Sequence, residues 1–271
     1  MLLETIFAPC VKERPLCVMA RAVLERLLDA PRLDALFART AQQQSTRELL
    51  FSSLVQRMSA VGLGVHPTVH AAYQANKEAI GVSTTALYTK LDRVETDVAA
   101  ALVRDSAALA APVVKALQAR HPRWVPGYQS KVLDGNHLAP TAQRLKAWRG
   151  TWAAPVPGQA LVVLDQQRLL ITEVLLHEDG QAQERRWIAE VLQHVHADDL
   201  WSEERHLCTL GLLVGMARRG AAFVVRQHGQ VQGEPLRLTR QGASRSGSVS
   251  EQALRVRDSD CGEVLRAFAP G

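Results

Sequence analysis

The segment 133–138 (LDGNHL) holds the first candidate for chemistry in this chain. It has the pattern of a short apolar strand that ends in an acid, Asp134, followed by glycine. Such a strand can present a carboxylate at the edge of a sheet, and carboxylates hold the metal ions of phosphoryl-transfer sites. From this hexapeptide alone, a surface Asp-Gly turn explains the residues equally well.

The elements predicted around Asp134 form a mixed sheet flanked by helices. Apolar and β-branched runs predict strands over 131–138, 160–164 and 169–176, with turn-forming residues at 157–158 and 179–180. A helix over 184–195 follows. A short strand around Trp201, whose side chain we expect in the core, a helix over 208–219 and a strand over 221–226 complete the order. In the helix over 184–195, the face that we expect to be buried carries Trp187, Ile188, Val191, Leu192 and Val195.

Residues 1–122 predict a helical domain. One apolar stripe runs from Leu16 to Leu28 at helical spacing, and we expect Pro31 to end it. Further helices are expected from Pro67, after Ser83 and between residues 97 and 119. The prolines in 121–127 (HPRWVPG) break helical continuation and mark the domain boundary. Another helix follows a capping box of Ser45 and Glu48, with its inward positions at Leu50, Leu54, Val55, Met58 and Val61 and its end at Gly62 and Gly64.

The stretch 82–91 (VSTTALYTKL) has the pattern of the second helix of a helix-turn-helix. Gly81 supplies the turn and Ser83 the cap, so Thr84, Thr85 and Lys90 become candidates for contacts with DNA phosphates or bases. The alternative is an ordinary capped helix whose leucines pack inward. Spacing alone favours that alternative.

Residues 229–271 predict a β-rich region. Short alternating runs at 236–240 and 253–257 suit half-exposed antiparallel strands with basic residues on the wet face. Because small and polar residues fill 242–248 (GASRSGS), we expect a flexible loop there.

Composition bounds the function classes. The chain has 271 residues, 47% of them hydrophobic, which is enough for a packed core, and a net charge of +5, which suits a polyanionic partner without requiring one. The four cysteines form no C-x-x-C pair, so we expect reduced thiols. We expect no membrane span, and hence a cytoplasmic protein. The phosphate-binding and serine-hydrolase motifs are absent, which argues against nucleotide-dependent and serine-hydrolase activities.

Four segments together resemble a known family. They are 133–138 (LDGNHL), 201–209 (WSEERHLCT), 218–228 (RRGAAFVVRQH) and 247–258 (GSVSEQALRVRD). They resemble the DDE transposases of bacterial insertion sequences, of the insertion sequence four type. In that family the first catalytic aspartate lies in L-D-G-[NT]-H-L, which assigns the role to Asp134. The second lies in a segment like A-D-R-N-F-C-T, which assigns it to Glu204.

The resemblance implies an activity with its partners and cofactor. The activity is cleavage and strand transfer of double-stranded DNA at terminal inverted repeats, with Mg²⁺ or Mn²⁺ held by Asp134 and Glu204. Arg226 and His228, at a strand end beside that site, become candidates for DNA phosphate contacts, although an exposed strand exit explains them equally well. No small-molecule substrate is implied. The protein would associate with the bacterial nucleoid when bound, and a homodimer stays open.

Two departures from the family qualify this expectation. Glutamate stands at position 204 where aspartate is expected, and its longer arm should impair catalysis. The third acid, on a Y-x-x-R-W-x-I-E-like helix, has no counterpart before Gly271. We therefore expect a truncated or impaired transposase. The alternative is a DNA-binding or dimerising protein without catalysis that competes with full-length transposase.

The expected fold is of the α+β or α/β class. It has a helical, DNA-binding domain over 1–122, then an incomplete RNase H-like mixed sheet over 126–228, and then the start of a β-rich insertion over 229–271.

Overall fold

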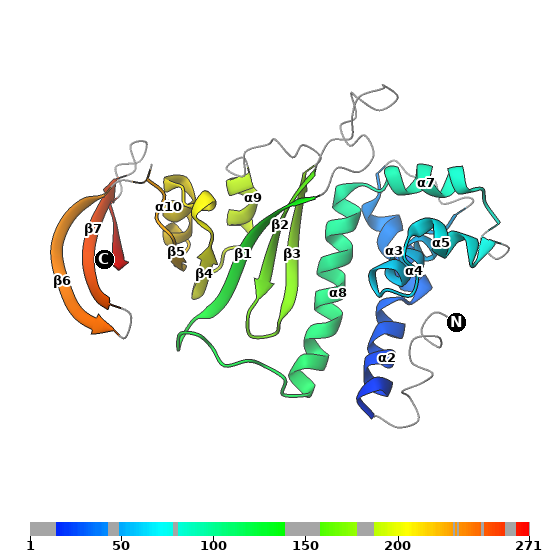
Figure 1. Ribbon diagram of the computed structural model, residues 1–271, viewed down its shortest axis with the longest axis horizontal. Helices are drawn as coiled ribbons and strands as arrows, with labels where there is room; N and C mark the ends of the chain where they lie inside the picture. The colour runs from blue at the N-terminus through cyan, green and yellow to red at the C-terminus, as the bar shows by residue number, and fades with distance from the viewer. Residues whose placement is uncertain are drawn as a thin grey trace, which may run out of the picture. The chain divides into compact units, whose positions relative to one another are not determined.

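The computed structural model (Figure 1) divides into two compact units. Unit 1 holds the described residues up to Gln118, and unit 2 holds those from Ala119 onward. The expected boundary at 122–126 lies close to this one, whereas the expected third region, 229–271, belongs to unit 2. The structure describes residues 15–42, 49–77, 81–138, 158–177, 187–229, 231, 233–244, 247–257 and 264–270.

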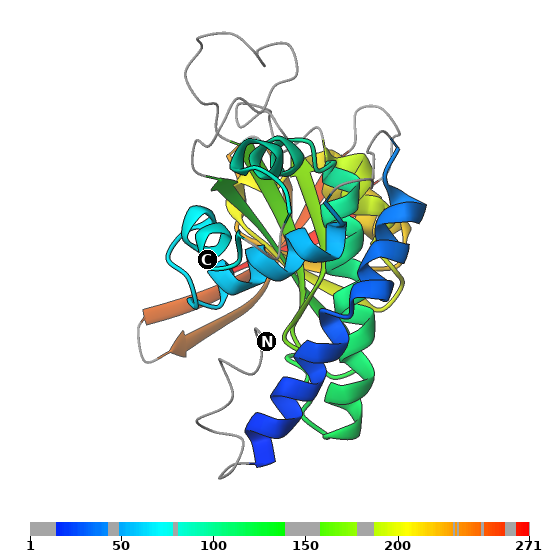
Figure 2. The same cartoon turned by 90° about the vertical axis from the view of Figure 1, so that its right-hand side faces the viewer.

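Unit 1 is helical, as the apolar spacing predicts. Helices α2 and α3 both contact the 21-residue helix α8, and α3 also contacts α4 (Figures 1 and 2). Its core is built from α3, α4 and their neighbours, with Leu33, Leu36, Phe37 and Leu87 almost completely buried. The helices are α2 (Pro15–Leu27), α3 (Ala30–Thr40), α4 (Phe51–Gly62), α5 (Val69–Gln74), α7 (Thr84–Asp92) and α8 (Thr96–Ala116).

Pro31 corrects one expectation. We expected it to end the apolar stripe of α2, but it lies in the first turn of the next helix, α3. Proline is favourable there because the first amide groups of a helix have no partner within the helix. The side chain of Asp29 caps the same helix by accepting a hydrogen bond from the Arg32 amide. Pro31 therefore begins a helix instead of closing one.

Helix α4 is shifted from its prediction. It begins at Phe51, with Leu50 as an exposed N-cap residue, and Met58 is exposed too. Leu54 and Val55 are buried as expected, and Gly64 lies just beyond the helix end with φ +73°. The capping box of Ser45 and Glu48 lies outside the described residues.

Unit 2 is built around a five-stranded mixed sheet in the order β3-β2-β1-β4-β5. β1, β4 and β5 are mutually parallel, while β2 is antiparallel to both of its neighbours. The strands that sequence predicted are all present, with ends that differ by a few residues. They are β1 (Gln129–Leu138), β2 (Gly158–Asp165), β3 (Leu170–His177), β4 (Asp199–Glu203) and β5 (Ala222–Val225).

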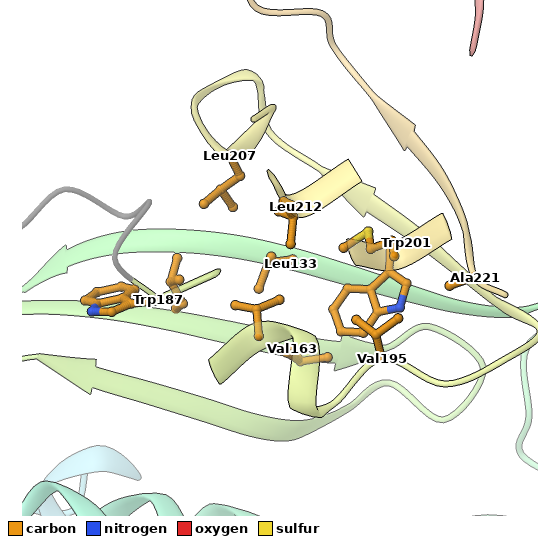
Figure 3. Close-up of a cluster of buried hydrophobic side chains, with 11 residues drawn as sticks. Leu133, Val163, Trp187, Val195, Trp201, Leu207, Leu212 and Ala221 are labelled. Atoms are coloured by element: carbon orange, nitrogen blue, oxygen red, sulfur yellow. The ribbon is translucent and has the colours of Figure 1, made fainter. Parts of the chain in front are cut away.

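One face of this sheet is covered by helices α9 (Ile188–Gln193) and α10 (Leu210–Arg218). Trp201, with no exposed surface, lies there in one apolar cluster with Leu133 of β1 and Val163 of β2 (Figure 3). Trp187, Val191 and Val195 supply the apolar stripe of the α9 segment, as their spacing predicts. Each large aliphatic or aromatic side chain buried in this layer stabilises the unit by about 1.5–3 kcal/mol.

A separate three-stranded antiparallel sheet follows in unit 2, made of β6 (Glu234–Ser244), β7 (Gly247–Arg257) and β8 (Val264–Pro270). The expectation of a loop over 242–248 is wrong for residues 242–244 and 247–248, because Gly242 pairs with Val249 and Ser244 pairs with Gly247, while residues 245–246 lie outside the described residues. Small and polar residues satisfy their backbone groups in an antiparallel ladder as well as apolar ones do. The described part of this hairpin therefore continues as strands to its tip.

In the part of the chain that the structure describes, no helix combines the length and the apolar character that crossing a membrane requires.

Candidate functional site

Asp134 lies inside β1 and is exposed. Its neighbour Leu133 is buried under the helices and forms the last parallel pair with Glu203 of β4. Beyond that pair β1 leaves β4 and continues to Leu138, paired with β2 alone. We expected Asp134 at the end of its strand. It lies instead within β1, at the point where the parallel pairing with β4 ends.

Glu204 is the residue that follows β4, and it is also exposed. Its backbone is extended, with φ −78° and ψ 158°, so it prolongs the strand direction by one residue. Since Leu133 pairs with Glu203, the next residues along the two parallel strands are Asp134 and Glu204. Neighbouring strands lie about 5 Å apart, so the two acids emerge side by side. The strands that lead to residues 134 and 204 are therefore neighbours, as expected, and the joint hold of the two side chains on a cation stays a prediction.

Glu203 is a functional candidate that sequence patterns did not single out. Its side chain is 7% exposed, and among the described residues neither carboxylate oxygen has a hydrogen-bond partner. Burial raises the pKa of Glu203 to about 8, because the charged form loses its hydration. Glu203 is therefore largely protonated at neutral pH. The available signal was the pair of consecutive acids, because alternation in a strand turns one of them inward.

Cys208 lies close to Glu203 in this buried region. Burial raises the pKa of the Cys208 thiol, and the Glu203 carboxylate raises it further. A backbone hydrogen bond from His228 acts in the opposite direction. With 2% exposure and a raised pKa, the Cys208 thiol suits packing more than nucleophilic chemistry.

The segment after β5 brings Arg226 and His228 to the same edge of the sheet. Arg226 is the first residue beyond Val225 and is exposed. His228 is half-buried, and its carbonyl accepts a hydrogen bond of 2.9 Å from the Val231 amide. The side chain of Gln227 also bonds the Val231 carbonyl, at 2.8 Å. These bonds fix the chain that leaves β5.

The candidate DNA contacts of unit 1 lie on α7. Gly81 has φ +67° and Ser83 caps the helix through the Ala86 amide, as the sequence predicts. Thr85 is exposed and Thr84 is half-buried. Lys90 is not a free surface cation, because its ammonium group donates to the Leu49 carbonyl and lies 5.2 Å from the centre of the Phe37 ring. Its contact with DNA stays a prediction and competes with these internal contacts.

No protein-family model matches the chain, and no curated protein matches it in sequence. Within the described residues, no group of three or more His, Cys, Asp or Glu side chains is arranged to hold a metal ion. At the end of the β1–β4 ladder the described residues present two exposed carboxylates, those of Asp134 and Glu204.

Proposed function

We propose that this chain is a DNA-strand-transfer protein of the DDE transposase type. One observation carries the proposal: Asp134 and Glu204, the two acids that the resemblance assigns to catalysis, directly follow the last parallel pair of β1 and β4. These residues are 70 positions apart in the chain. Their adjacency was not required by either segment alone.

The order of elements supports the same proposal. Three strands, a helix, a strand, a helix and a strand follow one another around Asp134, which is the order we expect for an RNase H-like core. The mixed sheet and the two helices on one face agree with that expectation. We infer an RNase H-like core in unit 2 from this order.

The two exposed carboxylates fit a divalent metal ion. Mg²⁺ takes oxygen ligands and is usually bound through one or two carboxylates together with substrate phosphates. Asp134 and Glu204 would hold it. When bound, the metal supplies Lewis-acid stabilisation of the phosphate and lowers the pKa of a bound water or hydroxyl. A homodimer that joins two DNA ends stays a prediction.

The chain's own residues would position the DNA phosphate. Asp134 sits on a strand paired on both sides up to Leu133, so its backbone is held firmly. Glu204 lies between β4 and a single 3-10 turn over Arg205–Leu207, on a less regular backbone. The longer glutamate arm places its carboxylate one methylene further from the backbone than an aspartate would. A shift of about 1 Å at a reacting centre can lower the rate about 10²-fold.

Nicking of a supercoiled plasmid that carries the DNA on both sides of the gene, where the proposal expects terminal inverted repeats, tests this function. We expect Mg²⁺-dependent nicking by the full chain, and its loss in Asp134→Asn. Glu190→Gln is the matched control, because Glu190 is an exposed acid on α9 of the same unit and should leave nicking unchanged. Nicking that persists in Asp134→Asn would reject the proposal.

A DNA-binding protein without catalysis is the second candidate. The exposed Thr85 on the capped helix α7 favours it, whereas Lys90 on the same helix is half-buried. It predicts tight binding of the same DNA with no nicking under any metal condition. Thr85→Ala should then weaken binding, since Thr85 is the exposed member of the predicted recognition helix.

A further inference from the structure

Three charged residues form one row across the parallel strands of unit 2. Glu203 pairs with Leu133 on one side and with Val225 on the other. The next residues are Asp134, Glu204 and Arg226, and all three are exposed. Since neighbouring strands lie about 5 Å apart, Arg226 stands beside Glu204 and about 10 Å from Asp134. The row reads acid, acid, arginine.

A second arginine directly follows Glu204 in the chain. Arg205 follows Glu204 directly, on the 3-10 turn between β4 and α10, and is exposed. Within the residues that the structure describes, the side chains of Arg205 and Arg226 take part in no ion pair and no hydrogen bond. Glu204 therefore has Arg205 next to it in the chain and Arg226 at the end of the neighbouring strand, and neither guanidinium group is paired within the described residues.

We infer that Arg205 and Arg226 form a phosphate clamp for the DNA strand that the two acids act on. This inference rests on the proposed function and specifies its substrate contact: the backbone phosphate at the reacting position and its neighbour along the strand. DNA carries one phosphate per 3.4 Å of helix axis per strand, so a strand crossing the row brings more than one phosphate to it.

Charge balance explains why arginine is needed at this edge. Two exposed carboxylates repel a phosphate, and each uncompensated like charge lowers the local concentration of the substrate. A guanidinium group offers two parallel N–H donors to one phosphate, which gives the contact a direction as well as a charge. Arg205 and Arg226 together offset the charge of Asp134 and Glu204, and their N–H groups would donate to the DNA phosphate.

A matched control lies at the opposite end of the strands of the same sheet. Arg123 is exposed and comes before β1, in the segment that is bonded to the β2–β3 turn through the His121 amide and the Gln167 carbonyl at 2.8 Å. Arg123→Ala removes the same charge as Arg226→Ala. It removes that charge near the start of β1, away from the row of Asp134, Glu204 and Arg226.

The test is a titration of the full chain into a fluorescently labelled random-sequence DNA duplex, in EDTA, over a series of KCl concentrations. The logarithm of the binding constant falls linearly with the logarithm of the salt concentration. The slope of this plot changes by about 0.9 for each phosphate contacted. We expect Arg205→Ala and Arg226→Ala each to reduce the slope by about 0.9, and the double variant by about twice that amount. Arg226→Lys should keep most of the slope because it keeps the charge.

The outcomes separate this inference from the proposed function. Slopes for Arg205→Ala and Arg226→Ala equal to that of Arg123→Ala would overturn the clamp, while binding by the unchanged chain would leave the proposed function standing. No binding of DNA by the unchanged chain, at any salt concentration, would overturn both. Equal slopes in these three variants would mean that the effect is one of net charge.

Discussion

Leu133 and Glu203 form the last pair of the parallel ladder between β1 and β4, and both side chains are buried. The next residue on each strand is an exposed acid, Asp134 on β1 and Glu204 beyond β4. A buried pair followed at once by an exposed pair places two carboxylates on a rigid support. The proposed activity depends on this change from a buried pair to an exposed pair of acids at the end of the ladder.

Glu204→Asp tests the effect of the glutamate arm. If Asp134 and Glu204 act together, shortening the arm should bring the second carboxylate to the position that the resembled family uses. We expect nicking of the inverted-repeat plasmid to rise, by up to about 10²-fold. Initial rates at matched Mg²⁺ measure it, with Glu190→Asp as the control. An unchanged or lower rate would mean that the arm length does not limit the reaction.

Glu203→Gln tests the buried carboxyl group. Because the folded-state pKa of Glu203 is raised to about 8 from 4.5, the folded protein binds this proton more tightly than the unfolded chain does. The resulting contribution to stability is complete below pH 4.5 and is lost as the pH rises to about 8. The slope over this window is about 1.4 kcal/mol per pH unit.

The glutamine variant has no proton to lose, so its stability should exceed that of the unchanged chain increasingly as the pH rises through this window. Urea unfolding followed by tryptophan fluorescence measures it, since Trp187 and Trp201 are buried in unit 2. A difference in stability that does not vary with pH would contradict the raised pKa of Glu203.

Gly215 and Gly211 form a matched pair in α10. A Cβ at Gly215 would approach the side chain of Leu192 on α9 to 3.2 Å at Cγ and more closely at both methyl groups, whereas a Cβ at Gly211 meets nothing within 4 Å. We expect Gly215→Ala to destabilise unit 2 by up to about 2 kcal/mol, since overpacking exceeds the gain in helix propensity. Gly211→Ala should be neutral or stabilising. The same fluorescence-detected unfolding compares them, and equal stabilities would show that α9 moves away freely.

Lys90 and Thr85 separate a structural from a DNA-binding role on α7. Removing the Lys90 ammonium group leaves the Leu49 carbonyl without its donor and removes the contact with the Phe37 ring. Lys90→Ala should therefore destabilise unit 1 by about 1–3 kcal/mol, while Thr85→Ala should not. Thermal unfolding followed by the helical circular dichroism signal measures this difference. A stable Lys90→Ala variant that binds DNA poorly would instead favour a direct contact.

Periodic patterns predicted the elements of this fold well. Alternation and β-branched runs located β1 to β3 and β5, and helical spacing located α8, because burial of one face imposes those periods directly. Helical spacing also located α2, although Leu16 and Met19 of its apolar stripe are exposed. Pro31 and residues 242–248 were misjudged because proline and small polar residues each suit two different places. Proline suits a helix start as well as a helix stop, and Gly and Ser pair in a hairpin as well as they fill a loop.

The candidate site was predictable in part. The motif around Asp134 and the family alignment of Glu204 led to two acids whose strands prove to be neighbours. The sequence placed Arg226 at a strand end beside the site, but its position next to Glu204 could not be derived, because the register between β4 and β5 depends on how α10 returns the chain to the sheet. Glu203 was missed for a related reason: only the register with Leu133 shows which of two consecutive acids turns inward.

Binding of Mn²⁺ to the full chain, followed by electron paramagnetic resonance, tests the central claim most directly, because it requires neither the correct DNA nor turnover. The account predicts that the unchanged chain binds Mn²⁺, that Asp134→Asn and Glu204→Gln each weaken binding, and that Glu190→Gln does not. The double variant should bind Mn²⁺ more weakly than either single variant, by an amount that departs from the sum of the two single effects, since both side chains hold one ion. Equal Mn²⁺ affinities in the unchanged chain and in Asp134→Asn would contradict the claim that Asp134 and Glu204 hold a metal together.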